Sequence, residues 1–197
     1  MGIWDSLFGK SKAKKTENSP FFPKQDDPLD VGFAKNFTSK GGKFLFNELK
    51  SNLAENFKNI CIENNWEPKH IISFDNSLSN EFGAGLISQK SASLKAYSAA
   101  LINCEYLISN TGKILLSEYQ IKHFKLVDLP QTIIVKANMN QLVRDVSQGM
   151  TLLKNKYPKK IPTNITTLKI RSDSEEEKQA DKSGTSSKSI YLLLEDK

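Results

Sequence analysis

Cysteine and histidine are scarce in this chain, and their scarcity excludes several classes of protein. The two cysteines, Cys61 and Cys104, are too few for a disulfide framework or for a self-contained four-cysteine iron–sulfur or zinc site. We expect both thiols to be reduced and buried, as in a cytoplasmic protein. The two histidines, His70 and His123, leave little room for metal chemistry. We therefore predict no metal site and no bound cofactor.

Arginine and long apolar runs are also lacking. Only Arg144 and Arg171 accompany the scattered lysines that give the net charge of +6. Nucleic-acid-binding proteins usually gather arginine and aromatic side chains on one face, so we predict no nucleic-acid binding. No apolar run approaches the roughly 20 residues of a membrane-spanning helix, and no secretory signal pattern is present. These absences predict a cytoplasmic protein.

The first 28 residues have the composition of a tail. Ile3, Trp4, Leu7 and Phe8 would share one face of a short helix, and lysines follow between positions 10 and 15. This pattern is typical of a weak interfacial anchor, which allows at most peripheral membrane contact through residues 1–15. A disordered tail, or aromatic side chains packed on a partner subunit, is the alternative interpretation. We predict a flexible tail over 1–28 and one domain over 29–197.

The domain alternates helix-like and strand-like segments. Residues 132–135 are an unbroken β-branched run, which is typical of a strand covered on both faces. The alternation predicts an α/β fold with a mostly parallel sheet and helices on both faces. The expected strands are 43–46, 71–74, 99–102, 114–116, 132–135, 165–170 and 190–194. The expected helices include 31–37, 47–65, a short one around 105–108, and one capped by Asn138 that runs through Leu153.

A polar segment precedes the last strand. Residues 172–177 repeat the capping-box spacing of Ser or Asp three positions before Glu, which predicts a short exposed helix. Residues 182–188 predict a flexible basic turn. We expect 171–188 to be the least ordered part of the domain, because the segment has no large apolar side chain to bury.

Two segments carry a resemblance to a known family. Residues 101–115 are LINCEYLISNTGKIL, and residues 125–135 are KLVDLPQTIIV. The first segment resembles the part of the LUD domain, or lactate utilization protein C, family in which the chain enters a strand through Glu-Thr-Gly-Thr. The second resembles the next signature of that family, a basic residue followed by Ser-Leu-Leu-Pro and a β-branched strand. The helix ending at Gly41-Gly42 is similar to the opening of the same family, and the order of elements agrees over residues 29–197.

This resemblance implies a fold similar to the CoA-transferase and sugar-phosphate-isomerase-like class. It also implies a bacterial protein with an accessory role in the oxidation of lactate, or a related 2-hydroxy acid, to the keto acid. Members of the family act beside iron–sulfur partner proteins. Because this chain has too few cysteines to hold a cluster, any electron transfer would depend on such iron–sulfur oxidoreductase subunits.

The chain departs from the family pattern where catalytic groups are expected. Asn110 stands in place of the family's glutamate, Lys113 replaces the last threonine, and the glycine-rich turn near the C-terminus is lost. Asparagine does not ionise, so it serves neither as a nucleophile nor as a general base. Whether the chain is an enzyme therefore stays open. The alternatives are an acyl- or CoA-transferase-like enzyme that uses the same crevice, and a membrane-surface adaptor.

Asn110, Thr111, Gly112, Lys113 and Lys125 are the candidate ligand-binding residues. The hydroxyl of Thr111, the backbone N–H of Gly112 and the lysine ammonium groups have the chemistry to hold a small anion. A tight turn that needs glycine for a positive φ explains the same residues without any ligand. No catalytic residue is predicted.

Overall fold

The computed structural model describes residues 27–48, 50–87, 93–171 and 187–196. The predicted amphipathic tail, the short helix after residue 171 and most of the basic turn lie outside these residues. Within them, no helix is long and apolar enough to cross a bilayer. The elements are α2 Leu29–Thr38, β1 Lys43–Asn47, α3 Lys50–Glu63, η1 Pro68–His70, β2 Ile71–Ser73, α4 Asn76–Phe82, β3 Gly85–Leu86, β4 Ala99–Asn103, β5 Tyr106–Ile108, β6 Lys113–Leu116, α5 Glu118–Ile121, η2 Leu126–Asp128, β7 Thr132–Asn138, η3 Met139–Gln141, β8 Leu142–Val143, α6 Val146–Lys156, β9 Thr166–Ile170 and β10 Ser187–Glu195.

The strands form one mixed sheet of ten strands in the order β3-β2-β4-β7-β10-β9-β6-β5-β8, with β1 also paired to β10. Every pairing from β3 to β10, and that of β1, is parallel. Beyond β9 the sheet turns antiparallel through β6 and β5, and β8 then adds in parallel to β5. The long central strands β7 and β10 are buried on both faces, as their unbroken apolar sequences predict.

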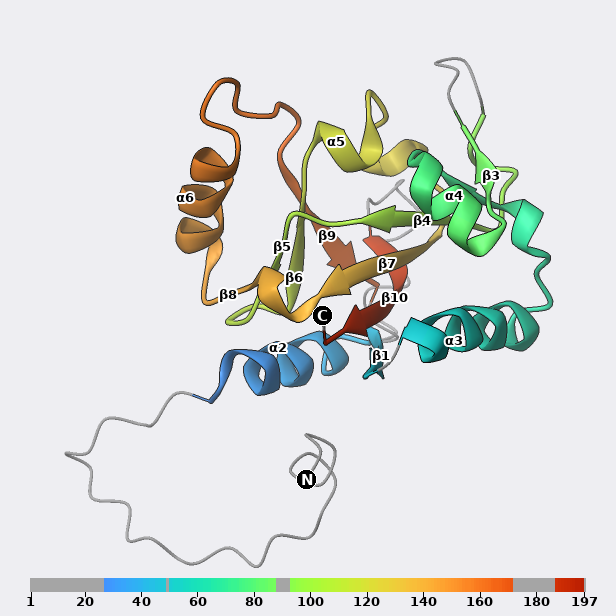
Figure 1. Cartoon of the computed structure of the whole chain (residues 1–197), viewed down its shortest axis with the longest axis horizontal. Helices are drawn as coiled ribbons and strands as arrows, with labels where there is room; N and C mark the ends of the chain where they lie inside the picture. The colour runs from blue at the N-terminus through green and yellow to red at the C-terminus, as the bar shows by residue number, and fades with distance from the viewer. Residues whose placement is uncertain (1–26, 49, 88–92, 172–186, 197) are drawn as a thin grey trace, which may run out of the picture.

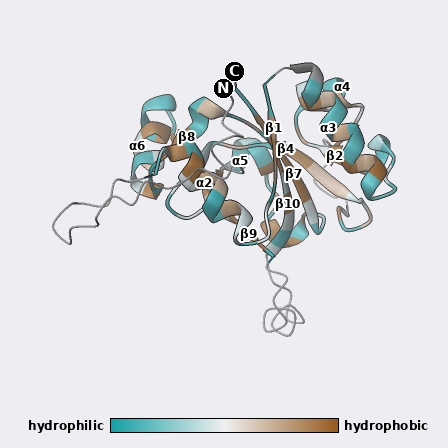
Figure 2. Ribbon diagram, turned by 90° about the horizontal axis from the view of Figure 1, so that it is seen from below, coloured by the Kyte–Doolittle hydropathy of each residue, from teal (hydrophilic) through white to brown (hydrophobic). Residues whose placement is uncertain are grey.

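Helices cover both faces of the parallel part, which confirms the predicted α/β class. Figure 2 shows α3 and α4 on one side of the strands and α2 and α6 on the other. The core under α3 and α4 contains Leu53, Phe57, Ile60, Cys61, Leu78 and Phe82. The core on the opposite face contains Phe33 and Phe37 of α2 and Ile121 of α5. α6 packs separately, through Leu153, against the antiparallel end of the sheet.

The prediction of a short helix around residues 105–108 is wrong. Residues Tyr106–Ile108 form strand β5, which pairs with β6 in a hairpin and with β8 on its other side. Leu107 belongs to the large core, whereas Tyr106 and Ile108 pack toward α6. Successive side chains of a strand point to opposite faces, so this alternation fits a strand between the large core and α6. A short isolated helix would not bury all three side chains.

The expected cap at Asn138 is also misplaced. The Asn138 side chain accepts from the backbone N–H of Asn140 and caps the short helix η3. Strand β8 then lies between η3 and α6, whose cap is Asp145, accepting from the N–H of Gln148. At the far end of the chain, Lys188 was expected in a flexible turn. It is buried in β10 instead, and its ammonium donates to the carbonyl of Leu129 at 2.9 Å.

Candidate functional site

A polar pocket lies where the chain leaves two neighbouring parallel strands in opposite directions. After β2 the chain enters α4 on one face of the sheet, and after β4 it passes through β5 and β6 to α5 on the other face. In open α/β sheets, ligands bind in the crevice that such a divergence opens at the carboxyl ends of the strands. The position of the pocket is therefore set by topology.

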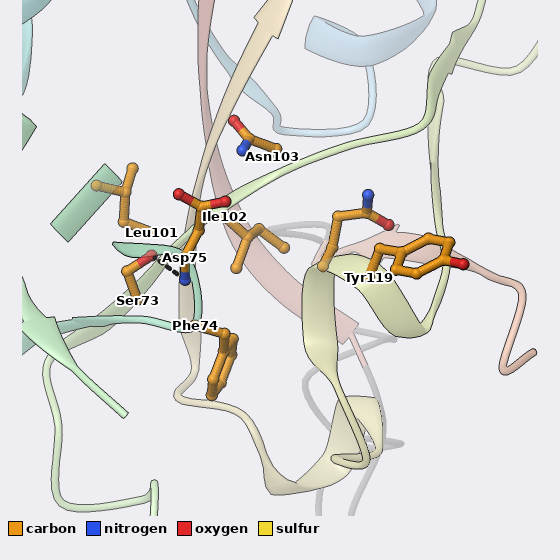
Figure 3. A pocket seen from close by; sticks show the side chains of 8 residues that line it. Ser73, Phe74, Asp75, Leu101, Ile102, Asn103 and Tyr119 are labelled. Carbon is orange, nitrogen blue, oxygen red and sulfur yellow. Dashed lines mark hydrogen bonds between the residues drawn. The ribbon is translucent and has the colours of Figure 1, made fainter. Parts of the chain in front are cut away.

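The pocket has a volume of about 120 Å³ and is lined by three segments. Figure 3 shows Asp75 and Tyr119 on opposite sides, Asn103 at one end and Phe74 at the other. Its lining residues are Ser73, Phe74 and Asp75 after β2, Leu101, Ile102 and Asn103 of β4, and Tyr119 and Gln120 of α5. A volume of 120 Å³ equals about four water molecules at liquid density, which suits a very small polar molecule.

Asp75 is held in place by two hydrogen bonds. Its backbone N–H donates to Ser73 Oγ at 3.2 Å, and its Oδ1 accepts from the N–H of Leu78 at 3.0 Å as the cap of α4. Neither Asp75 Oδ2 nor the Asn103 amide forms a hydrogen bond with the residues that the structure describes. The pocket thus offers an oriented carboxylate oxygen and an amide to a ligand.

Gln120 connects this pocket to a buried carboxylate. Its Nε2 donates to Glu105 Oε1 at 3.0 Å, and its Oε1 accepts from the backbone N–H of Ser117 at 2.8 Å. The hydroxyl of Ser117 donates to Glu105 Oε1 at 2.7 Å. One hydrogen of the Gln120 amide is therefore committed to Glu105, and the second remains for a ligand.

Glu105 has no exposed side-chain surface, and its second oxygen is bound by α6. Lys156 donates to Oε2 at 2.9 Å, and the hydroxyl of Tyr157 lies 3.3 Å from both oxygens. Burial raises the pKa of Glu105, but hydrogen bonds from Lys156, Ser117 and Gln120 outweigh it and hold the pKa below its ordinary value. Burial likewise opposes the charge of Lys156, but its bonds to Glu105 and Tyr157 raise the pKa of the ammonium. The Glu105 carboxylate orients Gln120 and is not itself accessible to a ligand, although the Lys156 side chain is 46% exposed.

The structure does not bring all five predicted ligand-binding residues together. Asn110, Thr111 and Gly112 form the turn of the β5–β6 hairpin, and Lys113 begins β6. Lys125 lies near the opposite end of β6. The carbonyl of its neighbour Phe124 accepts from Asn164, which lies just before β9, and Leu116 at the end of β6 pairs with the start of β9.

The hairpin turn docks on α2. Gly112 has a φ of +61°, and a Cβ there would lie 2.5 Å from backbone atoms of Asn36 and Phe37. The carbonyl of Thr111 accepts from Lys40 just beyond the end of α2, and Asn36 donates to the carbonyl of Ser109 at 2.8 Å. These contacts account for the glycine by packing and backbone conformation.

Sequence reasoning missed Asp75, Asn103 and Gln120. Asp75 and Asn103 follow or end predicted strands, which is a detectable signal, but their proximity depends on β2 and β4 being neighbours. Both cysteines are free and buried, as expected. Burial and the adjacent Glu105 raise the pKa of the Cys104 thiol, so it stays protonated. Among the described residues, no group of three or more metal-ligating side chains occurs.

Lys122, just after α5, has a φ of 54° and a ψ of −127°, a conformation that favours glycine. We expect Lys122→Gly to raise the free energy of unfolding by about 1 kcal/mol, since strain of about 1–3 kcal/mol is relieved and glycine loses more entropy on folding. Urea denaturation measures the change. Asn65→Gly is the control, because asparagine at its φ of 55° is less strained. A less stable Lys122→Gly variant would contradict this account.

Comparisons with known proteins agree with this fold. The crystal structure of a DUF162 family protein from Deinococcus radiodurans is similar to 85% of this chain, and the match covers 96% of that protein with a TM-score of 0.60. The sequence identity is 16%, so the similarity concerns the fold. No curated protein matches the chain significantly. The model of the LUD domain matches residues 88–193, which include β4, α5 and the Glu105 network. The chain therefore belongs to the LUD domain family.

Proposed function

We propose that this chain binds a small 2-hydroxy acid or its keto acid at the pocket between β2 and β4, as an accessory subunit of 2-hydroxy-acid oxidation. The observation that carries the proposal is that the oriented Asp75 carboxylate lines one pocket with the amides of Asn103 and Gln120, each of which has an N–H left to donate. A carboxylate accepts from a ligand hydroxyl, and amide N–H groups donate to a ligand carboxyl or carbonyl oxygen. Lactate, with six non-hydrogen atoms, suits the size of this pocket.

Iron–sulfur partner proteins belong to the same proposal. The chain has only two cysteines, and both are buried and 43 positions apart in sequence, so it supplies no ligand set for a cluster. Oxidation of a 2-hydroxy acid releases two electrons, and in this proposal an iron–sulfur partner protein accepts them. Membership of the LUD domain family supports this role, and deletion of the gene should impair growth of its host on lactate but not on glucose.

Ligand binding is tested directly by calorimetry with lactate and pyruvate. We expect Asp75→Asn to weaken the binding of lactate, whose hydroxyl donates to that carboxylate, and Asn103→Ala to weaken the binding of both ligands, in each case about fivefold to tenfold, because one hydrogen bond is removed. Asparagine caps helices as well as aspartate does, so Asp75→Asn should leave α4 intact. Asn110→Ala, in the hairpin turn, is the matched control. If Asn110→Ala or Lys113→Met abolished binding while the pocket variants did not, the ligand site would lie at the hairpin turn.

Asp75 also supports a second candidate, an acyl- or CoA-transferase-like activity. A carboxylate at a pocket can attack a thioester carbonyl, form a mixed anhydride and release the CoA thiolate. Glu105 is unsuitable because four side chains occupy its oxygens. Incubation with acetyl-CoA and hydroxylamine should then give a hydroxamate at Asp75 by mass spectrometry. If no hydroxamate forms at Asp75 and the chain binds lactate, the result supports the accessory role over the transferase activity.

A further inference from the structure

A second, apolar cleft lies beside the polar pocket and shares Phe74 with it. It has a volume of about 370 Å³ and lies between the segment after β2, strand β3 and the segment after α5. The rings of Phe74 and Phe124 are 5.2 Å apart, and the ring of His123 is 4.2 Å from that of Phe124. The described lining residues are Phe74, Asn76, Leu86, Ile87, Lys122, His123 and Phe124.

The lining is apolar and partly exposed to water. Leu86 is 47% exposed, whereas Phe74 and Phe124, which line the same cleft, are buried. Small-molecule sites are typically concave, mostly apolar and between about 300 and 1,000 Å³ in volume, with a few polar groups that fix orientation. The cleft meets each of these criteria, whereas the polar pocket is below that size range.

The described residues that line the cleft carry charge of one sign. Of the described residues that line it, only Lys122 and His123 can be positively charged, and none is negatively charged. Lys122 also has a backbone conformation that glycine would adopt without strain. Lys122 lines the cleft and is exposed, so an anionic group of a ligand there would gain a charge-assisted hydrogen bond from its ammonium group.

We propose that this cleft binds a medium-chain aliphatic carboxylate, with the chain against Leu86, Ile87 and Phe124 and the carboxylate at Lys122. A single lysine fits a monoanion better than a phosphate. At about 30 Å³ per water-sized group, the cleft has room for about a dozen such groups, which corresponds to an eight-carbon acid with space remaining. Apart from Phe74, which lines both cavities, the proposal depends on residues other than those of the proposed function.

Octanoate is the probe, and its binding is measured by calorimetry on the full chain. We expect Leu86→Ser to weaken octanoate binding about fivefold, because about half of a leucine side chain loses its apolar contact. Lys122→Gln and Lys122→Gly should each weaken it about tenfold. Octan-1-ol should bind wild type more weakly than octanoate and should be insensitive to Lys122→Gln. Ile62→Ser, at an exposed apolar position of α3, and Lys154→Gln, on α6, are the matched controls and should bind like wild type.

The variants separate this proposal from others. Lys122→Gly should denature at a higher urea concentration than wild type, so weaker octanoate binding by that variant is not a consequence of misfolding. Asp75→Asn and Asn103→Ala should leave octanoate binding unchanged, so failure of the lactate experiment does not decide this one. The proposal is overturned if octanoate does not bind, if octanol binds as tightly, or if the Leu86 and Lys122 variants bind like wild type.

Discussion

Replacing Glu105 by alanine is expected to lower the free energy of unfolding by about 3–5 kcal/mol, the largest effect that we predict. The carboxylate has no exposed surface and accepts from Ser117, Gln120, Lys156 and Tyr157. Its removal leaves the buried Ser117 hydroxyl without that acceptor and opens a cavity among Ser117, Gln120 and Lys156. Urea denaturation followed by circular dichroism measures the loss.

Two further variants define what the Glu105 carboxylate contributes. Glu63→Ala removes an exposed carboxylate from α3 and should change stability by less than about 1 kcal/mol. Glu105→Gln keeps the side-chain shape but removes the charge that faces Lys156, so we expect a loss between those of the two alanine variants. A Glu105→Ala protein within about 1 kcal/mol of wild type would show that desolvation of the carboxylate cancels its hydrogen bonds.

The same carboxylate predicts a pH dependence of stability. Its hydrogen bonds hold the pKa of Glu105 in the folded protein below the ordinary value of 4.5. A group whose pKa is lowered by folding stabilises the folded state above its unfolded pKa and loses that contribution as the pH falls through its folded pKa. The stability difference between wild type and Glu105→Gln should therefore be constant above about pH 5.5 and shrink below about pH 4.5. A constant difference down to pH 3 would contradict this.

The sequence predicts the local elements well where a segment has one dominant pattern. The β-branched run at 132–135 forms the centre of β7, and the stripe of Leu53, Phe57 and Ile60 is buried under α3. The prediction failed at 105–108, where three consecutive apolar residues fit a short helix or a strand equally well. The choice is made by partners distant in sequence, since Leu107 pairs with Ile114 and Leu142.

The candidate site was less predictable than the fold because it depends on strand order. Asp75 and Asn103 are 28 positions apart, and they line one pocket because β2 pairs with β4. The role of Glu105 depends on Lys156, which is 51 residues away in sequence on α6, the helix that packs against β5. The available signal was Glu105 itself, a carboxylate directly before the apolar run 106–108. Because a charged group is rarely buried without a partner, its position beside a buried strand indicates a partner elsewhere in the chain.

Gly112→Ala is expected to lower the free energy of unfolding by about 3 kcal/mol, and it tests the role of the hairpin turn. Alanine at a φ of +61° costs about 1–2 kcal/mol, and its Cβ would lie 2.5 Å from the backbone of α2, which forces the hairpin and the helix apart. Because the obstructing atoms are backbone atoms, no side-chain rotation relieves the clash. Thermal and urea denaturation measure the loss.

Gly83→Ala is the matched control for this prediction. Gly83 has a similar φ of +68°, but a Cβ there would meet nothing closer than Pro68 Cβ at 3.9 Å. It should therefore lose only the conformational part, about 1–2 kcal/mol, and the difference between the two variants measures the contact of the turn with α2. If Gly112→Ala lost no more stability than Gly83→Ala but bound lactate more weakly, the turn would be part of the ligand site. A larger loss of stability with unchanged lactate affinity in the folded variant would identify Gly112 as the residue that lets the β5–β6 hairpin pack on α2.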